Sequence, residues 1–182
     1  MPTSQSKLRR ASQTVVALTA LALSGCGGAA VQQTSPQPQT VQHQLTIGGG
    51  PGQPKAVYGP PLNGQAPRGL LMLIHGGSWL GLNPVAFKIE VATSVIFRNL
   101  GFETMTVDYR HGARGIADVE NFYRDARRRF GPRLPICAIG VSAGGHIGLM
   151  LAVRNPDLRC VIDMAGPTDL PALKTDPGGA VG

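Results

Sequence analysis

The chain has 182 residues, of which 42% are hydrophobic and 15% charged, and this apolar fraction excludes a wholly disordered chain. Its 25 glycines and 15 prolines follow no three-residue period, so a collagen-like fold is excluded as well. The formal net charge of +7 includes three cations near the N-terminus, and the basic cluster at 124–129 has no nucleic-acid-reading motif beside it, so we expect no nucleic-acid partner.

Residues 1–25 have the features of a secretory signal peptide. Lys7, Arg9 and Arg10 precede an apolar stretch at 15–23, which is shorter than the roughly 20 residues that span a bilayer as a helix. Leu23-Ser24-Gly25-Cys26 resembles the lipobox of bacterial lipoproteins. The resemblance implies that Cys26 is lipidated and anchors the chain to a membrane of the bacterial cell envelope, periplasmic or at the outer surface. A plain secretory signal or an uncleaved anchor stays open.

Residues 26–54 are predicted to be a flexible tether. The segment from Gly27 to Gln44 is rich in Gln and Pro without hydrophobic periodicity, and a Gly/Pro-rich stretch follows it. His43 lies inside this segment and is interpreted as a solvated side chain. Folded structure is expected from about residue 45, and residues 55–182 are assigned to the main domain.

The remaining segments alternate between strand and helix patterns. Strands are predicted at Lys55–Tyr58, as an edge strand, and at 69–74, 102–107, 135–140 and 159–165; helices are predicted at 84–100, 119–130 and 143–155, the first with Asn83 as its N-cap. This alternation predicts an α/β fold, a mostly parallel sheet with helices on both faces. In such folds ligands bind beyond the carboxyl ends of the strands.

The sequence Gly140-Val141-Ser142-Ala143-Gly144 matches the G-x-S-x-G nucleophile elbow. It falls between a predicted strand and a predicted helix, as the elbow requires. Glycines on both sides of such a serine relieve the crowding of a very tight turn. We therefore predict that Ser142 is a catalytic nucleophile, exposed at a helix N-terminus.

His75-Gly76-Gly77 follows the strand predicted at 69–74. Backbone N–H groups of Gly76 and Gly77, together with that of Ala143, are candidates for an oxyanion hole. His75 is interpreted as a structural residue. Trp79 is assigned to the wall of a substrate pocket, with simple packing under the loop as an equal alternative.

These motifs resemble the α/β-hydrolase superfamily, in particular the branch with an H-G-G loop that holds carboxylesterases and acetyl-xylan and feruloyl esterases. Asp108-Tyr109-Arg110 and Gly166-Pro167-Thr168-Asp169-Leu170 add to the resemblance, which covers about residues 56–170. It implies a serine hydrolase that acts on small ester substrates, with no cofactor and no metal.

The family's chain order of Ser, then acid, then His is not completed within the sequence. His146 follows Ser142 by one helical turn and is interpreted as a packing residue, and His111 is the other candidate base. Neither Asp163 nor Asp169 is assigned as the acid. The expectation is an incomplete hydrolase domain whose activity is weak or absent in this chain.

Two further hypotheses about function stay open: the chain is a fragment of a peptidase of the prolyl-oligopeptidase type, or it is a degenerate hydrolase domain kept for binding. The three cysteines form no C-x-x-C pair, so no zinc or redox motif is indicated. Cys137 and Cys160 fall on neighbouring strands in the family's topology. They are expected to be buried free thiols rather than a disulfide.

Overall fold

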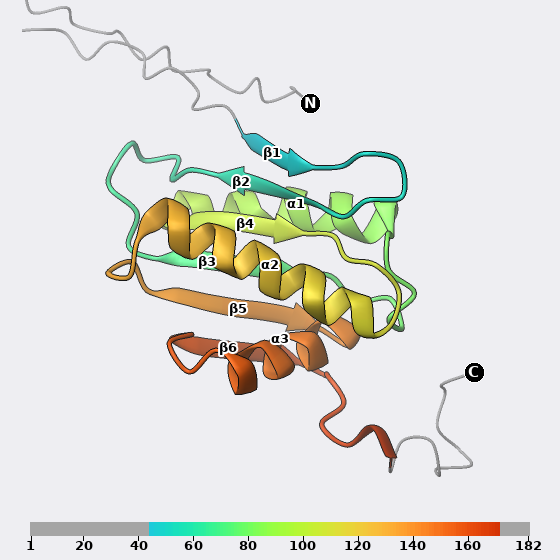
Figure 1. Ribbon diagram of the computed structural model, residues 1–182. Helices are drawn as coiled ribbons and strands as arrows, with labels where there is room; N and C mark the ends of the chain where they lie inside the picture. Colours follow the sequence, from blue (N-terminus) through green and yellow to red (C-terminus); the bar gives the residue numbers. More distant parts are fainter. Residues whose placement is uncertain (1–43, 172–182) are drawn as a thin grey trace, which may run out of the picture. The chain divides into compact units, whose positions relative to one another are not determined.

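The computed structural model describes residues 44–171, and the predicted signal peptide, Cys26 and His43 lie outside the described residues (Figure 1). This part of the chain forms six strands and three helices, which alternate from β3 onward: β1 (Leu45–Gly48), β2 (Lys55–Gly59), β3 (Leu70–Ile74), α1 (Pro84–Asn99), β4 (Glu103–Val107), α2 (Ala113–Phe130), β5 (Ile136–Val141), α3 (Ala143–Arg154) and β6 (Cys160–Met164).

The strands form one sheet in the order β1-β2-β4-β3-β5-β6. The four strands β4, β3, β5 and β6 run parallel, whereas β1 pairs antiparallel with β2 and β2 pairs antiparallel with β4. The prediction of a mostly parallel α/β sheet is therefore confirmed. Parallel neighbours bring the segments after β3, β4, β5 and β6 to one edge of the sheet.

Two predictions at the start of the domain differ from the structure. The strand that begins at Lys55 is not an edge strand, because β2 lies between β1 and β4. Residues 45–54, which the domain assignment placed in the tether, form β1 and the turn after it, in agreement with the expected start of folded structure near residue 45. This turn uses Gly48 and Gly49 at φ of 78° and 94°, a conformation that suits glycine and joins the two strands as a hairpin.

Local sequence explains where the helices begin. The side chain of Asn83 accepts a hydrogen bond of 3.0 Å from the backbone N–H of Ala86, and Pro84 occupies the first turn of α1, as predicted. Helix α2 begins at Ala113, six residues before its predicted start. Its first turn lacks the apolar spacing from which the prediction was made.

The helices cover both faces of the sheet (Figure 1), with α2 and α3 on one face and α1 on the other. The larger buried cluster joins alternate residues of the central strands to Val119 and Tyr123 of α2 and to Ile147 and Leu151 of α3. Leu71, Leu73 and Ile139 face the α1 side instead. No helix among residues 44–171 is long and apolar enough to span a membrane.

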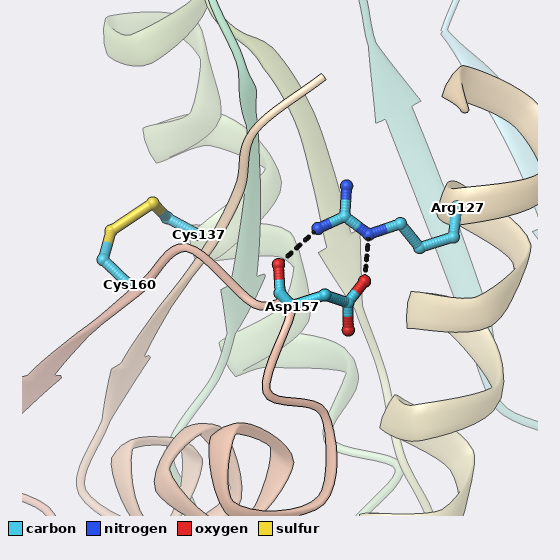
Figure 2. Close-up of a disulfide and its surroundings, with 4 residues drawn as sticks. All are labelled: Arg127, Cys137, Asp157 and Cys160. Atoms are coloured by element: carbon cyan, nitrogen blue, oxygen red, sulfur yellow. Dashed lines mark hydrogen bonds and ion pairs between the residues drawn. A yellow bond between two sulfur atoms is a disulfide. The ribbon is translucent and has the colours of Figure 1, made fainter. Parts of the chain in front are cut away.

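The expectation of buried free thiols is wrong, because Cys137 and Cys160 form a disulfide (Figure 2). The two residues are register partners on the parallel strands β5 and β6, and their Cα atoms lie 4.7 Å apart, within the range that a disulfide spans. Neither is buried, since Cys137 is half-buried and Cys160 is exposed.

Arg127 of α2 lies near this disulfide and binds the loops that lead into β5 and β6 (Figure 2). Its guanidinium donates to the carbonyl oxygens of Leu134 and Asp157, both at 2.7 Å. It also forms an ion pair of 3.0 Å with the Asp157 carboxylate and donates to the Tyr123 hydroxyl. One side chain thus ties α2 to the amino ends of both strands.

Candidate active site

Ser142 is exposed in the turn between β5 and α3, with φ of 53° and ψ of −119°. A non-glycine residue in this region is strained, and such strain is typical of functional turns. The flanking glycines are required by the turn. A Cβ atom at Gly140 would overlap the carbonyl of Gly144, and one at Gly144 would overlap the carbonyl of Ile74. The structure thus gives the G-x-S-x-G segment the elbow geometry predicted for it.

The backbone around Ser142 is firmly held. Its N–H donates to the carbonyl oxygen of Met164 at 2.8 Å, and its own carbonyl accepts from the N–H of His146 at 3.2 Å. Ala143 is buried and is the first residue of α3, so its N–H has no acceptor within the helix. This N–H lies at the positive end of the helix dipole, which favours an anion near the serine.

The segment after β3 lies directly beside the elbow. A Cβ atom at Gly76 would lie 3.0 Å from the carbonyl oxygen of Val141 and 3.4 Å from the Cβ atom of Ser142. Gly77 follows with φ of 127°, which a residue with a side chain rarely adopts. The structure therefore brings Gly76 and Ser142 together, as the oxyanion-hole prediction requires.

His75 is buried and both of its ring nitrogens face acceptors. Nε2 lies 3.0 Å from Oδ1 of Asp108, and Nδ1 lies 2.7 Å from the carbonyl oxygen of Gly76. The ring also stacks on Tyr109, whose hydroxyl donates to the carbonyl oxygen of His75. His75 therefore joins β3 to β4 as a structural residue, in agreement with its interpretation from sequence, and neither nitrogen is free to accept a proton from Ser142.

Trp79 contacts the nucleophile helix through His146. Its indole Nε1–H donates to Nδ1 of His146 at 3.2 Å, and the two rings meet edge to face with centroids 5.5 Å apart. Trp79 also packs against the larger core cluster. These contacts match the packing alternative, and a role in a substrate pocket stays a prediction.

Asp163, Asp169 and His111 were the remaining candidates for an acid or a base, and their positions are as follows. Asp163 of β6 accepts from the N–H of Gly166 at 2.8 Å, next to Gly145 of α3. Asp169 is exposed near the end of the described residues, and His111 is exposed in the loop after β4. Within residues 44–171, no hydrogen bond joins His75, His146 or Asp163 to the Ser142 hydroxyl, and no group of three or more metal-binding side chains occurs.

Neither a scan against protein-family models nor a search of curated proteins finds a match to the sequence. Solved structures do match. An arylesterase shares 25% identity at a TM-score of 0.51, covering 65% of this chain and 42% of its own. A carboxyl esterase from Bacillus coagulans shares 18% sequence identity at a TM-score of 0.53, and the match covers 66% of this chain and 43% of the esterase. A serine hydrolase homologue from Coxiella burnetii shares 16% sequence identity at a TM-score of 0.55, and the match covers 75% of this chain and 68% of the homologue. The chain has the α/β-hydrolase fold.

The chain spans less than half the length of the two esterases and about two thirds of the Coxiella protein.

The pairing of Asp108 with His75 was not predicted from the sequence. Asp108 is buried, pairs with His75 and also accepts from the N–H of Tyr109. The available signal was the placement of His75 and Asp108, each of which directly follows a strand.

Proposed function

We propose that the chain carries the nucleophile and oxyanion hole of a serine hydrolase of the carboxylesterase type, acting on small ester substrates. One observation carries the proposal: an exposed serine with φ of 53° stands at the N-terminus of α3, against Gly76 of the H-G-G segment. The fold shared with the arylesterase and the carboxyl esterase supports the reaction class. The H-G-G branch is the more specific form of the same proposal.

In this mechanism the Ser142 hydroxyl oxygen attacks the ester carbonyl, and the carbonyl oxygen becomes negatively charged. The N–H of Ala143, with those of Gly76 and Gly77, stabilises that charge by hydrogen bonding. Attack also requires a base for the hydroxyl proton. His75 is engaged at both nitrogens and His146 accepts from Trp79, so we assign neither to this role. We therefore expect weak ester hydrolysis from this chain in isolation.

A fluorophosphonate probe tests the nucleophile directly, because the serine hydroxyl oxygen bonds to the phosphorus of the probe and fluoride leaves. Since no base is assigned to Ser142, we expect slow labelling of the full chain on prolonged incubation, which maps by peptide mass spectrometry to Ser142 and is lost in Ser142→Ala. Thr93→Ala, which removes the hydroxyl of a half-buried residue on α1 that donates to the carbonyl oxygen of Ile89, is the matched control and should label as the unmodified chain does. Absence of labelling, or labelling at another residue, would favour a degenerate hydrolase domain used for binding.

We also propose that the protein is exported and anchored to a membrane of the bacterial envelope through a lipidated Cys26. The signal-like segment before Cys26 supports this, and the disulfide between Cys137 and Cys160 suits an oxidising compartment. Radiolabelled palmitate should enter the full chain but not Cys26→Ala. The double variant Cys137→Ala/Cys160→Ala, which keeps Cys26, should still incorporate the label; label that persists in Cys26→Ala would contradict the anchor.

A further inference from the structure

A basic pocket opens at the same edge of the sheet as Ser142. It has a volume of about 360 Å³ and is lined by residues of three loops and the first turn of α2: Gly52, Leu80, Leu82, Arg110, His111 and Arg114. Three of the six lining residues are basic and none is acidic. The pocket therefore differs from a general apolar ligand cavity, and its lining suits an anion.

The two arginines have different environments. Arg110 is held in place by Asp118, which accepts from its Nε at 2.9 Å, from its NH2 group at 2.6 Å and from its backbone N–H at 2.9 Å. Arg114 is exposed and has no ion-pair partner among residues 44–171. Since Asp118 neutralises one guanidinium, the charge of Arg114 remains uncompensated at the pocket.

The backbone near the pocket adds to the positive electrostatic potential that Arg114 creates there. Helix α2 begins here at Ala113, has no acidic residue in its first turn and receives no side-chain cap. Gly112, its N-cap residue, instead donates its own N–H to the carbonyl oxygen of Trp79 at 3.0 Å. The positive end of the helix dipole thus faces the region of Arg114 without a compensating carboxylate in that turn.

We propose that this pocket binds a phosphate group, either free phosphate or the phosphate of a small monoester. The unpaired Arg114 supplies a charge-assisted contact, the fixed Arg110 supplies N–H groups of known direction, and His111 can donate a further hydrogen bond. A dianion gains more electrostatic binding free energy than a monoanion from the charge of Arg114 together with the helix dipole.

The pocket is also linked to the oxyanion-hole segment. The N–H of Leu82 donates to the carbonyl oxygen of Tyr109, and the contact from Gly112 to Trp79 joins the same two loops. A phosphate group in the pocket would therefore lie against Leu80 and Leu82, in the same loop after β3 that holds Gly76 and Gly77. The phosphate site stands independently of hydrolysis, because none of its lining residues takes part in the proposed attack by Ser142.

The test is an NMR titration of the isotope-labelled full chain with inorganic phosphate, with sodium chloride at matched ionic strength as the reference. We expect saturable shifts of the backbone N–H signals at 113–115, with weaker binding of acetate. Arg114→Gln should weaken phosphate binding about tenfold, the loss of one charge-assisted contact. Glycerol phosphate as a second probe distinguishes a monoester from free phosphate as the preferred ligand.

Arg133→Gln is the matched control, since it removes one exposed cation from the loop after α2, outside the pocket. It should leave phosphate affinity unchanged, and so should Ser142→Ala, which separates this site from the proposed hydrolysis. The phosphate site is overturned if chloride reproduces the shifts, if no saturation occurs, or if Arg114→Gln and Arg133→Gln weaken binding equally.

Discussion

The two ends of the parallel strands are built in opposite ways. Within residues 44–171, every non-glycine residue with positive φ comes after the carboxyl end of a strand: Ser78, Trp79 and Leu82 after β3, Ser142 after β5 and Ala165 after β6. The amino ends of β5 and β6 hold the disulfide and the contacts of Arg127 instead (Figure 2).

This difference suggests that the carboxyl ends of the strands hold the functional residues and that the amino ends stabilise the sheet. Strained backbone persists only where the surrounding structure over-determines it, and it is found mostly at functional sites. The covalent and ionic links at the amino ends fix the spacing of β5 and β6 some five residues before Ser142 and Ala165. We infer that stability at one edge offsets the strain that the other edge needs for its chemistry.

The largest effect should follow from filling the tight turn at the carboxyl edge. In Gly144→Ala the new Cβ atom meets the backbone carbonyl of Ile74, which cannot move without shifting β3, so we expect a loss of about 3–4 kcal/mol in the free energy of unfolding. Urea unfolding followed by circular dichroism measures it. Gly148→Ala in the same helix is the control, because its Cβ atom would lie 3.3 Å from a side-chain atom of Val161 and should change stability by about 1 kcal/mol or less. Equal losses in the two variants would contradict the requirement for glycine at 144.

The next largest effect should come from the disulfide at the amino edge. It closes a loop with a sequence separation of 23, so Cys137→Ala/Cys160→Ala should lose about 3 kcal/mol of unfolding free energy. Thermal unfolding with and without a reductant measures this. Reductant should lower the midpoint of the unmodified chain and leave that of the double variant unchanged. A reductant effect of the same size in both would mean that the bridge does not stabilise the fold.

A smaller loss is expected when the contacts of Arg127 are removed. Arg127→Met keeps most of the aliphatic stem but leaves the carbonyl oxygens of Leu134 and Asp157 without their donor, at a cost of about 1–3 kcal/mol. Arg128→Met is the matched control. Arg128 is mostly exposed, and its one ion pair within residues 44–171 is with Asp125 at 3.3 Å, so its loss should cost about 0.5 kcal/mol or less. Chemical denaturation of the two variants side by side decides whether position 127 is special.

Sequence patterns predicted the parts of the fold that depend on nearby residues. Asn83 and Pro84 marked the start of α1, and Gly140 and Gly144 marked the elbow, because capping and tight turns are decided within a few residues. Strand β1 was not predicted, since its four residues are mostly exposed and are held by pairing with β2 rather than by apolar spacing.

The contacts that the sequence did not reveal join residues far apart in the chain. The disulfide depends on the register of β5 against β6, and a shift of one residue would turn one cysteine to the other face of the sheet. The pairing of His75 with Asp108 spans 33 positions and depends on β3 and β4 being neighbours. Such register and neighbour relations follow from tertiary packing.

The smallest expected effect concerns the hydrogen bond from Trp79 to His146 at the carboxyl edge. Burial lowers the pKa of His146 below its ordinary 6.5, with Asp163 as the nearby charge that opposes this shift. A proton on Nδ1 would displace the indole N–H, which donates to that nitrogen. Because the folded-state pKa lies below the unfolded value, the stabilisation is complete above pH 6.5 and is lost as the pH falls through the folded-state pKa.

Trp79 is the chain's single tryptophan, so tryptophan fluorescence reports the surroundings of this one side chain, of which the His146 ring is a part. We expect the emission of the unmodified chain to titrate with a midpoint below 6.5, and the loss of the bond to cost about 0.5–1.5 kcal/mol. His146→Asn is the matched variant, because its amide oxygen can accept from the indole N–H but does not titrate, and its fluorescence should stay constant over the same range. A midpoint above 6.5, or an identical titration in His146→Asn, would show that another group controls the loop. If the titration follows His146, the loop that holds Gly76 and Gly77 is joined to α3 by a hydrogen bond that breaks when His146 is protonated. The disulfide at the amino ends of β5 and β6 does not change over this pH range.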